Sequence, residues 1–185
     1  MTCQYIITNE IIEKKKTIEI YYDNQKKRIK IKLNKNKRFI KNFLDLNIDC
    51  TIVEILPNDN VNEDYFLLPN IDYSNNFDDL KKKKIYIPQF PNGGNLSYSY
   101  GEIKKIERNQ FMYNASTLSG SSGSPIFLAQ TTFVIGIHKR GDESKKVNYG
   151  DFIFPIINLI ENEKIEDKKI IIIFRKKILL YSRIK

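Results

Sequence analysis

Short stretches of alternating or continuous apolar residues recur through the first third of the chain. Thr17–Tyr22 and Arg28–Leu33 alternate apolar and polar residues, while Tyr5–Thr8 and Thr51–Leu56 are largely apolar over the length of a strand. A period of two predicts half-buried strands, and a short apolar run predicts a buried strand. The polar stretch 57–84, rich in Asn and Asp, predicts a surface connection between two halves.

Strand-like stretches return in the second half of the chain and are separated by turns such as PNGGN. Their spacing of roughly 8 to 12 residues is typical of a β-sandwich or β-barrel. The stretches are Lys84–Phe90, Ser97–Ile106, Ser124–Leu128 and Thr131–His138. From Pro155 the sequence IINLIENE predicts a closing helix, and the apolar bursts of the last 20 or so residues fit a hairpin or a helical extension. We therefore expect an all-β fold with a short C-terminal helix.

The charge of the chain raises the question of a nucleic-acid partner. The chain has 185 residues, 41% hydrophobic and 29% charged, which is an ordinary globular balance, and its net charge is +9. Clustered Lys and Arg side chains can replace counterions along a phosphate backbone. Here the lysines lie in short runs, such as Lys14–Lys16 and Lys81–Lys84, among Asp and Glu. We expect no nucleic-acid partner.

Cysteine and histidine are scarce. Cys3 and Cys50 do not make a disulfide framework, and a single histidine argues against a zinc site. We expect neither a metal nor another cofactor. No apolar run approaches the roughly 18 to 20 residues that cross a bilayer. The start of the chain carries Glu10 and Glu13 and does not read as a signal peptide. We expect no membrane partner and a cytoplasmic location.

The most informative stretch for chemistry is Ser116–Pro125, which reads STLSGSSGSP. A nucleophilic serine needs a sharp turn whose backbone N–H groups point at the substrate carbonyl oxygen. The glycines on both sides of Ser122 permit such a turn, because glycine adopts backbone angles that other residues avoid. The alternative is a flexible loop of Ser and Gly without chemistry.

Other segments occur with this stretch in a fixed order. They are Tyr86–Pro91, Ser99–Ile103, Val134–His138 and Asn148–Ile153. Together with GSSGSP, this series resembles the C-terminal barrel of trypsin-like serine proteases, most closely the glutamyl endopeptidase branch. The resemblance implies a chymotrypsin-like double β-barrel. On that basis residues 1–80 are an incomplete first barrel, 81–165 the second barrel with the nucleophile loop, and 166–185 an extension.

The resemblance also implies catalytic roles. Ser122 corresponds to the nucleophile, and the N–H groups of Gly120 and Ser122 correspond to the oxyanion hole. Asp49, at the head of an apolar strand, corresponds to the aspartate that orients the catalytic imidazole. Asp45 is the alternative for that aspartate.

The family's histidine is missing from the segment expected to carry it. The matching piece is interpreted as Ile7–Ile12, with Glu10 or Ile11 at the place of the histidine. Without an imidazole the serine proton has no acceptor at neutral pH, and in a related triad this loss costs on the order of 10⁶ in turnover. An exposed carboxylate such as Glu10 is too weak a base to replace it.

The only histidine, His138, falls where the resemblance places the wall of the substrate pocket. Together with Thr117, it corresponds to the pair that binds an acidic side chain before the cleaved bond in glutamyl endopeptidases. An imidazole N–H and a hydroxyl can hold a carboxylate. Lys139 and Arg140 would add positive potential, and the backbone of Lys139–Gly141 resembles the edge that pairs with an extended substrate. The alternative is a buried strand histidine satisfied by a neighbour.

Two functions remain open at this point. The first is a serine endopeptidase with a preference for acidic residues, impaired by the missing histidine. The second is an inactive relative, a pseudoprotease, that binds extended acidic peptides in the same cleft. A truncated product with a poorly folding first barrel is a third possibility. For either of the first two functions we expect an acidic peptide or protein partner and a monomer.

Overall fold

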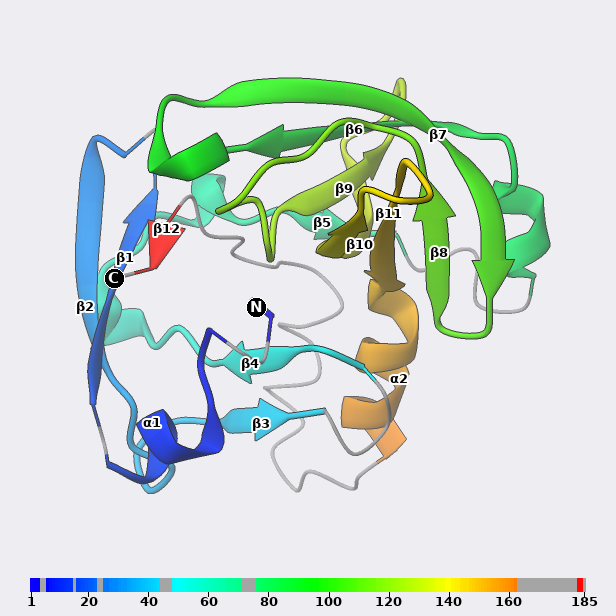
Figure 1. Cartoon of the computed structure of the whole chain (residues 1–185). Coiled ribbons are helices and arrows are strands. Elements are labelled where there is room, and N and C mark those ends of the chain that lie inside the picture. Colours follow the sequence, from blue (N-terminus) through cyan, green and yellow to red (C-terminus); the bar gives the residue numbers. More distant parts are fainter. Residues whose placement is uncertain are drawn as a thin grey trace.

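The computed structural model describes residues 1–3, 6–14, 16–22, 25–43, 48–70, 76–162 and 183–184. These residues form mainly β-strands, with two α-helices and several single turns of 3₁₀-helix (Figure 1). The strands of the first half are β1 Thr17–Tyr22, β2 Lys27–Lys32, β3 Ile40–Asn42, β4 Thr51–Val53 and β5 Leu68–Pro69. Those that follow are β6 Lys84–Gln89, β7 Ser97–Glu107, β8 Gln110–Tyr113, β9 Pro125–Leu128, β10 Phe133–Asp142, β11 Val147–Phe152 and β12 Arg183–Ile184. The helices are α1 Asn9–Glu13, α2 Ile153–Asn162, η2 Pro57–Asp59, η3 Glu63–Tyr65, η4 Phe77–Leu80 and η5 Pro91–Gly93.

The second half of the chain is a closed barrel of six strands. The order β11-β8-β7-β6-β9-β10 is closed by pairing of β10 with β11, and β5 adds to β10 in parallel. Alternation of buried and more exposed residues along β6 places Ile85 and Ile87 inside. Gly101 on β7 lets the backbone of Ala115 approach closely, because a Cβ there would lie 2.4 Å from the Ala115 nitrogen. Alternation along β6 thus contributes Ile85 and Ile87 to the buried interior of the barrel.

The first half forms two small sheets instead of a closed barrel among the described residues. β1 pairs with β2 and with β12, and β3 pairs with β4. Ile12 of α1 packs into the same hydrophobic cluster as Ile20, Ile31 and Leu33. The predicted all-β fold with an incomplete first barrel and a short C-terminal helix is confirmed.

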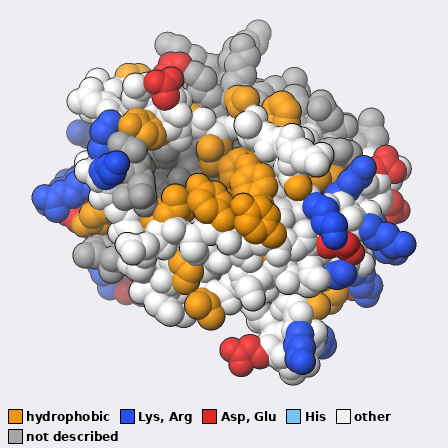
Figure 2. All heavy atoms as spheres, turned by 90° about the horizontal axis from the view of Figure 1, so that it is seen from above, with side chains coloured by type: hydrophobic (Ala, Val, Ile, Leu, Met, Phe, Trp, Pro, Cys, Tyr) orange, Lys and Arg blue, Asp and Glu red, His pale blue; other side chains and the backbone are white. Residues whose placement is uncertain are grey.

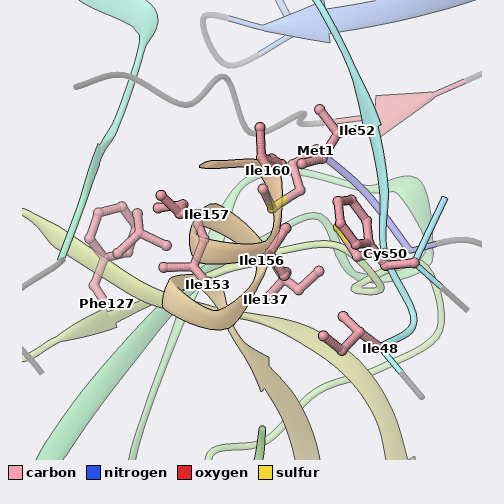
Figure 3. Close-up of a cluster of buried hydrophobic side chains, with 12 residues drawn as sticks. Met1, Ile48, Cys50, Ile52, Phe127, Ile137, Ile153, Ile156, Ile157 and Ile160 are labelled. Carbon is pink, nitrogen blue, oxygen red and sulfur yellow. The ribbon is translucent and has the colours of Figure 1, made fainter. Parts of the chain in front are cut away.

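The helix α2 connects the two halves through a buried hydrophobic cluster (Figure 3). The cluster joins side chains of α2, β9, β10 and β4, and it includes Met1. Its members are Met1, Phe43, Ile48, Cys50, Ile52, Phe127, Val134, Ile137, Ile153, Ile156, Ile157 and Ile160. α2 begins two residues before the predicted Pro155, which is its third residue. Proline is tolerated there, because the first N–H groups of a helix have no intrahelical partner.

The two ends of the chain differ in how much of their predicted structure falls within the described residues. A strand was predicted over Tyr5–Thr8, but Ile6 and Ile7 form a turn and Thr8 caps α1, accepting a hydrogen bond from the Ile11 N–H. Of the extension 166–185, only Arg183–Ile184 is described, as β12, and the rest lies outside the described residues.

The outer face of β6 and β7 carries exposed aromatic side chains. Tyr98 is 56% exposed and Tyr100 72% exposed, and the Tyr100 ring lies 6.4 Å from that of Tyr86. Figure 2 views the molecule from this side and shows hydrophobic side chains gathered near its centre. Within the described ranges, no helix has the length and apolar character needed to cross a membrane.

Candidate active site

The predicted nucleophile lies in a tight turn between β8 and β9. The Ser121 N–H donates to the Leu118 carbonyl at 3.1 Å, and the Ser124 N–H donates to the Ser121 carbonyl at 3.0 Å. The turn is fastened to β10 by two bonds of 2.8 Å, from the Gly123 N–H to the His138 carbonyl and from the His138 N–H to the Ser124 carbonyl. The backbone of this turn is therefore fixed on both sides of Ser122.

Glycine is required on each side of Ser122. Gly120 has φ +87° and Gly123 has φ +81°, both in the left-handed region that side chains disfavour. A Cβ on Gly123 would also lie 2.9 Å from the Thr2 hydroxyl oxygen. These constraints explain the spacing of glycines in the motif.

The turn leaves several N–H groups and hydroxyls without partners among the described residues. Among its backbone amides, the N–H groups of Ser121, Gly123 and Ser124 donate to backbone carbonyls. Across the described part of the chain, the N–H groups of Gly120 and Ser122 and the Ser122 hydroxyl have no hydrogen-bond partner. Two amides beside a hydroxyl are the groups that an oxyanion hole requires.

Six of the predicted site residues surround one open pocket of about 780 Å³. Its lining includes Ser122, Thr117, His138, Lys139, Arg140 and Gly141. The chain folds them together because β10 runs alongside the nucleophile turn, and Thr117 precedes that turn. The structure thus places the predicted nucleophile and substrate residues in one pocket.

His138 is buried in the pocket wall and is neutral at neutral pH. Its Nδ1 lies 2.5 Å from the Tyr113 hydroxyl. Burial lowers the pKa of His138 to about 4, and a hydrogen bond to the Tyr149 backbone opposes this shift in part. Burial also holds the pKa of Tyr113 well above 10, so its hydroxyl keeps its proton. No hydrogen bond joins His138 to Ser122 within the described residues.

Thr117 is held by an amide that the sequence reasoning did not single out. Its hydroxyl donates to Asn148 Oδ1 at 2.7 Å, and Asn148 Nδ2 donates to the Ala115 carbonyl at 2.7 Å. The second bond fixes the orientation of the Asn148 amide. Asn148 and Tyr113 both support predicted pocket residues. Their pairing depends on the register of β8 against β11, which only the folded barrel provides.

Asp49 is not among the residues that line the pocket, and its backbone is tied to a buried carboxylate. Its backbone N–H donates to Asp151 Oδ2 at 2.9 Å, and Lys139 Nζ lies 3.5 Å from the same oxygen. Desolvation raises the pKa of Asp151, and the Lys139 charge opposes this. The sequence signal for Asp151 is an acid inside the otherwise apolar YGDFIF run. Asp45, the alternative to Asp49, lies outside the described residues.

The segment interpreted as carrying the histidine position, Ile7–Ile12, includes the start of α1. Thr8 begins α1, the Glu10 side chain is exposed and pairs with Lys14, and Ile11 packs on the first-half cluster. The segment Ile7–Ile12 thus contains a helix start, because Thr8 caps α1 and apolar residues follow it. Its correspondence to the family's histidine segment stays a prediction.

The segment Thr2–Cys3 lies against the turn at Gly123. Thr2 exchanges two backbone hydrogen bonds with Thr51, at 3.1 and 2.8 Å. The Cys3 thiol donates to the His138 carbonyl at 3.2 Å. Both cysteines, Cys3 and Cys50, are buried thiols outside any disulfide.

The barrel, the turn at Ser122 and the pocket beside it define a chymotrypsin-like fold with a peptidase-type site. Comparison with known families agrees, since residues 1–137 match the trypsin-like peptidase domain. The chain belongs to this family. A glutamyl endopeptidase of Staphylococcus epidermidis is 29% identical over 113 residues, 58% of this chain and 40% of that protein. The chain therefore spans less than half the length of this relative.

Two solved structures share the fold. A Glu endopeptidase in complex with MPD superimposes with a TM-score of 0.57 at 15% identity, covering 88% of this chain and 79% of its own. The inactive form of the Rv3671c protease gives a TM-score of 0.58 at 12% identity, covering 87% and 76%. The predicted chymotrypsin-like fold is confirmed by these likenesses.

Proposed function

We propose that this chain is a trypsin-like serine endopeptidase that forms an acyl-enzyme on Ser122 and prefers an acidic residue before the cleaved bond. The observation that carries the proposal is the pair of unpartnered N–H groups, on Gly120 and Ser122, beside the Ser122 hydroxyl. Such donors stabilise the oxyanion that forms when the serine oxygen attacks a peptide carbonyl.

The pocket chemistry supports a preference for a carboxylate. A protonated Tyr113 hydroxyl that donates to Nδ1 of His138 leaves the ring proton on Nε2. That N–H, released from its hydrogen bond to the Tyr149 backbone, and the Thr117 hydroxyl, turned away from Asn148, would then donate to the substrate carboxylate. Because a neutral imidazole carries no charge, Arg140 would contribute most of the positive potential of the pocket, since Lys139 is paired with Asp151.

Hydrolysis by this chain is proposed to be impaired. Serine attack needs a base that takes the hydroxyl proton and later gives it to the leaving amine. The sequence has one histidine, and His138 is engaged with Tyr113 in the pocket wall. Glu10, the other residue considered, pairs with Lys14 at the surface. This observation favours a second candidate function, in which the cleft binds acidic peptides without cleaving them.

Labelling of Ser122 separates the two functions. The protein is treated with a fluorophosphonate probe, which a reactive serine oxygen attacks with loss of fluoride. In parallel it is assayed with a chromogenic peptide that carries Glu before the reporter group. Labelling and turnover that both disappear in Ser122→Ala support a peptidase. Ser119→Ala is the matched control, because this serine lies in the same loop, and it should keep both labelling and turnover.

Binding of peptides tests the pocket independently of turnover. A fluorescent peptide with Glu before the scissile position is titrated against the Ser122→Ala protein and compared with the same peptide carrying Gln. A pocket that accepts an acidic side chain predicts that the Glu peptide binds about tenfold more tightly than the Gln peptide, as for a charge-assisted hydrogen bond. Equal affinity for the Glu and Gln peptides would contradict the acidic preference, even if Ser122 were labelled.

A further inference from the structure

Arg140 lies on the rim of the pocket in a position set by an irregularity of β10. In the pairing of β10 with β11, His138 faces Gly150 and Arg140 faces Tyr149, so Lys139 is an extra residue between them. A bulge of this kind changes the direction of the side chains that follow it. Lys139 accordingly turns inward to Asp151, while Arg140 stays exposed at the pocket.

The guanidinium of Arg140 is held in place by an aromatic ring. Its Cζ lies 4.1 Å from the centroid of the Tyr149 ring, and Tyr149 is itself buried in the barrel wall. An arginine stacked on a ring keeps the N–H groups at its edge available for a planar, bidentate acceptor. Among the described residues the side chain of Arg140 has no hydrogen bond and no ion pair. It is thus a fixed fork of donors without an acceptor.

The charges around Arg140 favour an anion. Four other charged residues line the pocket, namely Lys139, Asp142, Glu143 and Lys146. Lys139 is paired with Asp151 at 3.5 Å, and Asp142 is paired with Lys145 at 3.4 Å. Outside these pairs the rim keeps two cations, Arg140 and Lys146, against one anion, Glu143.

We infer that Arg140 binds the carboxylate of a second acidic residue on the N-terminal side of the one held by His138. This inference rests on the proposed function, in which an extended peptide runs along Lys139–Gly141. An extended peptide rises about 3.3 Å per residue, so neighbours of the bound acidic residue pass along the rim of β10. The substrate class is then a peptide with two acidic residues one to three positions apart.

The test uses four fluorescent peptides and the full chain with Ser122→Ala. One peptide has a single Glu at the scissile position with Ala upstream. The other three add a second Glu one, two or three positions toward the N-terminus. Affinities are measured by fluorescence anisotropy, and the readout is the ratio of the single-Glu Kd to each double-Glu Kd within one protein. We expect one upstream position to raise affinity about three- to tenfold, as for a partly exposed ion pair.

Variants of Arg140 assign the effect. In Arg140→Gln the ratio of the single-Glu Kd to the double-Glu Kd should fall to within about twofold of one. In Arg140→Lys only part of the gain in affinity should remain, because lysine lacks the planar guanidinium group that can bind a carboxylate through two N–H groups. Arg108→Gln removes the same charge at the β7–β8 turn, away from the pocket lining, and should keep the gain.

The outcomes separate this inference from the proposed function. A Glu-over-Gln preference at the scissile position without any upstream gain would overturn the inference and leave the proposed function intact. A gain that persists in Arg140→Gln would overturn it as well. A third outcome is a gain in affinity from the upstream Glu that depends on Arg140, with no preference for Glu over Gln at the scissile position. It would support binding of a carboxylate by Arg140 and contradict the proposal that the pocket at His138 binds an acidic side chain.

Discussion

The hydroxyl of Tyr113 and Nδ1 of His138 lie 2.5 Å apart, and both side chains are buried. Tyr113→Phe removes the hydroxyl that faces Nδ1, and with it the donor that the proposed tautomer needs at that nitrogen. We expect the preference for Glu over Gln peptides to fall several-fold and the free energy of unfolding to drop by about 1–3 kcal/mol. Peptide titration and urea denaturation check both effects.

Tyr100→Phe is the matched control for this change, because its ring is largely exposed on the outer face of β7. It should alter neither peptide preference nor stability by more than about 0.5 kcal/mol. An unchanged Glu preference in Tyr113→Phe would show that Tyr113 does not orient the imidazole.

Burial of His138 also predicts how stability depends on pH. Burial lowers its pKa from 6.5 to about 4. As pH falls through 6.5 the unfolded chain binds a proton that the folded chain refuses until about pH 4. The free energy of unfolding should therefore fall with decreasing pH across this window, by at most about 1.4 kcal/mol per pH unit.

This pH effect is isolated by comparing the parent protein with His138→Gln. Urea denaturation at several pH values from about 7 down to about 5 should show a shallower decrease of stability in the variant, since other groups titrate equally in both. Parallel curves for the two proteins would contradict a lowered pKa at position 138.

At the scale of elements, β10 and β11 are joined to the Asp49 segment by buried charges. Asp151 is fully buried, and its Oδ2 accepts from the Asp49 N–H and faces Lys139, whose side chain is 17% exposed. Asp151→Asn leaves the Lys139 charge without its partner. We expect a loss below the roughly 3–5 kcal/mol seen for fully buried pairs, because Lys139 keeps some contact with water.

A double variant tests whether the cost comes from the unpaired charge. Adding Lys139→Met to Asp151→Asn should recover most of the lost stability, because neither partner is then charged. Chemical denaturation of the two single variants and the double variant completes the cycle. Additive losses would show that the ion pair contributes nothing beyond the separate side chains.

The elements differed in how far the sequence could predict them. β1 and β6 alternate cleanly, and both were predicted close to their observed bounds. Tyr5–Thr8 was apolar enough for a strand, but the capping threonine at its end and the isoleucines after it favour a helix start. Local periodicity does not distinguish these cases when the run is short.

The site shows the same division between local and distant information. Ser122, Thr117 and His138 were predicted as site residues because each belongs to a short motif. Tyr113, Asn148 and Asp151 were not assigned roles, because each acts through a residue more than ten positions away. Such partners depend on strand register and on the bulge at Lys139, which no single stretch of sequence specifies.

At the scale of the whole molecule, the barrel and the first half share one buried cluster. α2 contributes Ile153, Ile156, Ile157 and Ile160, β10 contributes Ile137, and the first half contributes Ile48, Ile52 and Met1 (Figure 3). The site depends on this junction, because the Asp49 segment comes from the first half and the Ser122 turn from the second. Loss of packing at α2 should therefore affect both halves at once.

Ile156→Ala tests this coupling, since Ile156 is fully buried in the shared cluster. Removing its side chain from a packed core should cost about 2–5 kcal/mol. If the halves unfold as one unit, amide exchange in β1 and in β7 should accelerate together and by similar factors. Leu118→Ala, at an exposed position, should leave both sets of amides within about 0.5 kcal/mol of the parent. Faster exchange confined to β7 would mean that the first half is stabilised by its own cluster around Ile20 and that the junction does not couple the two halves.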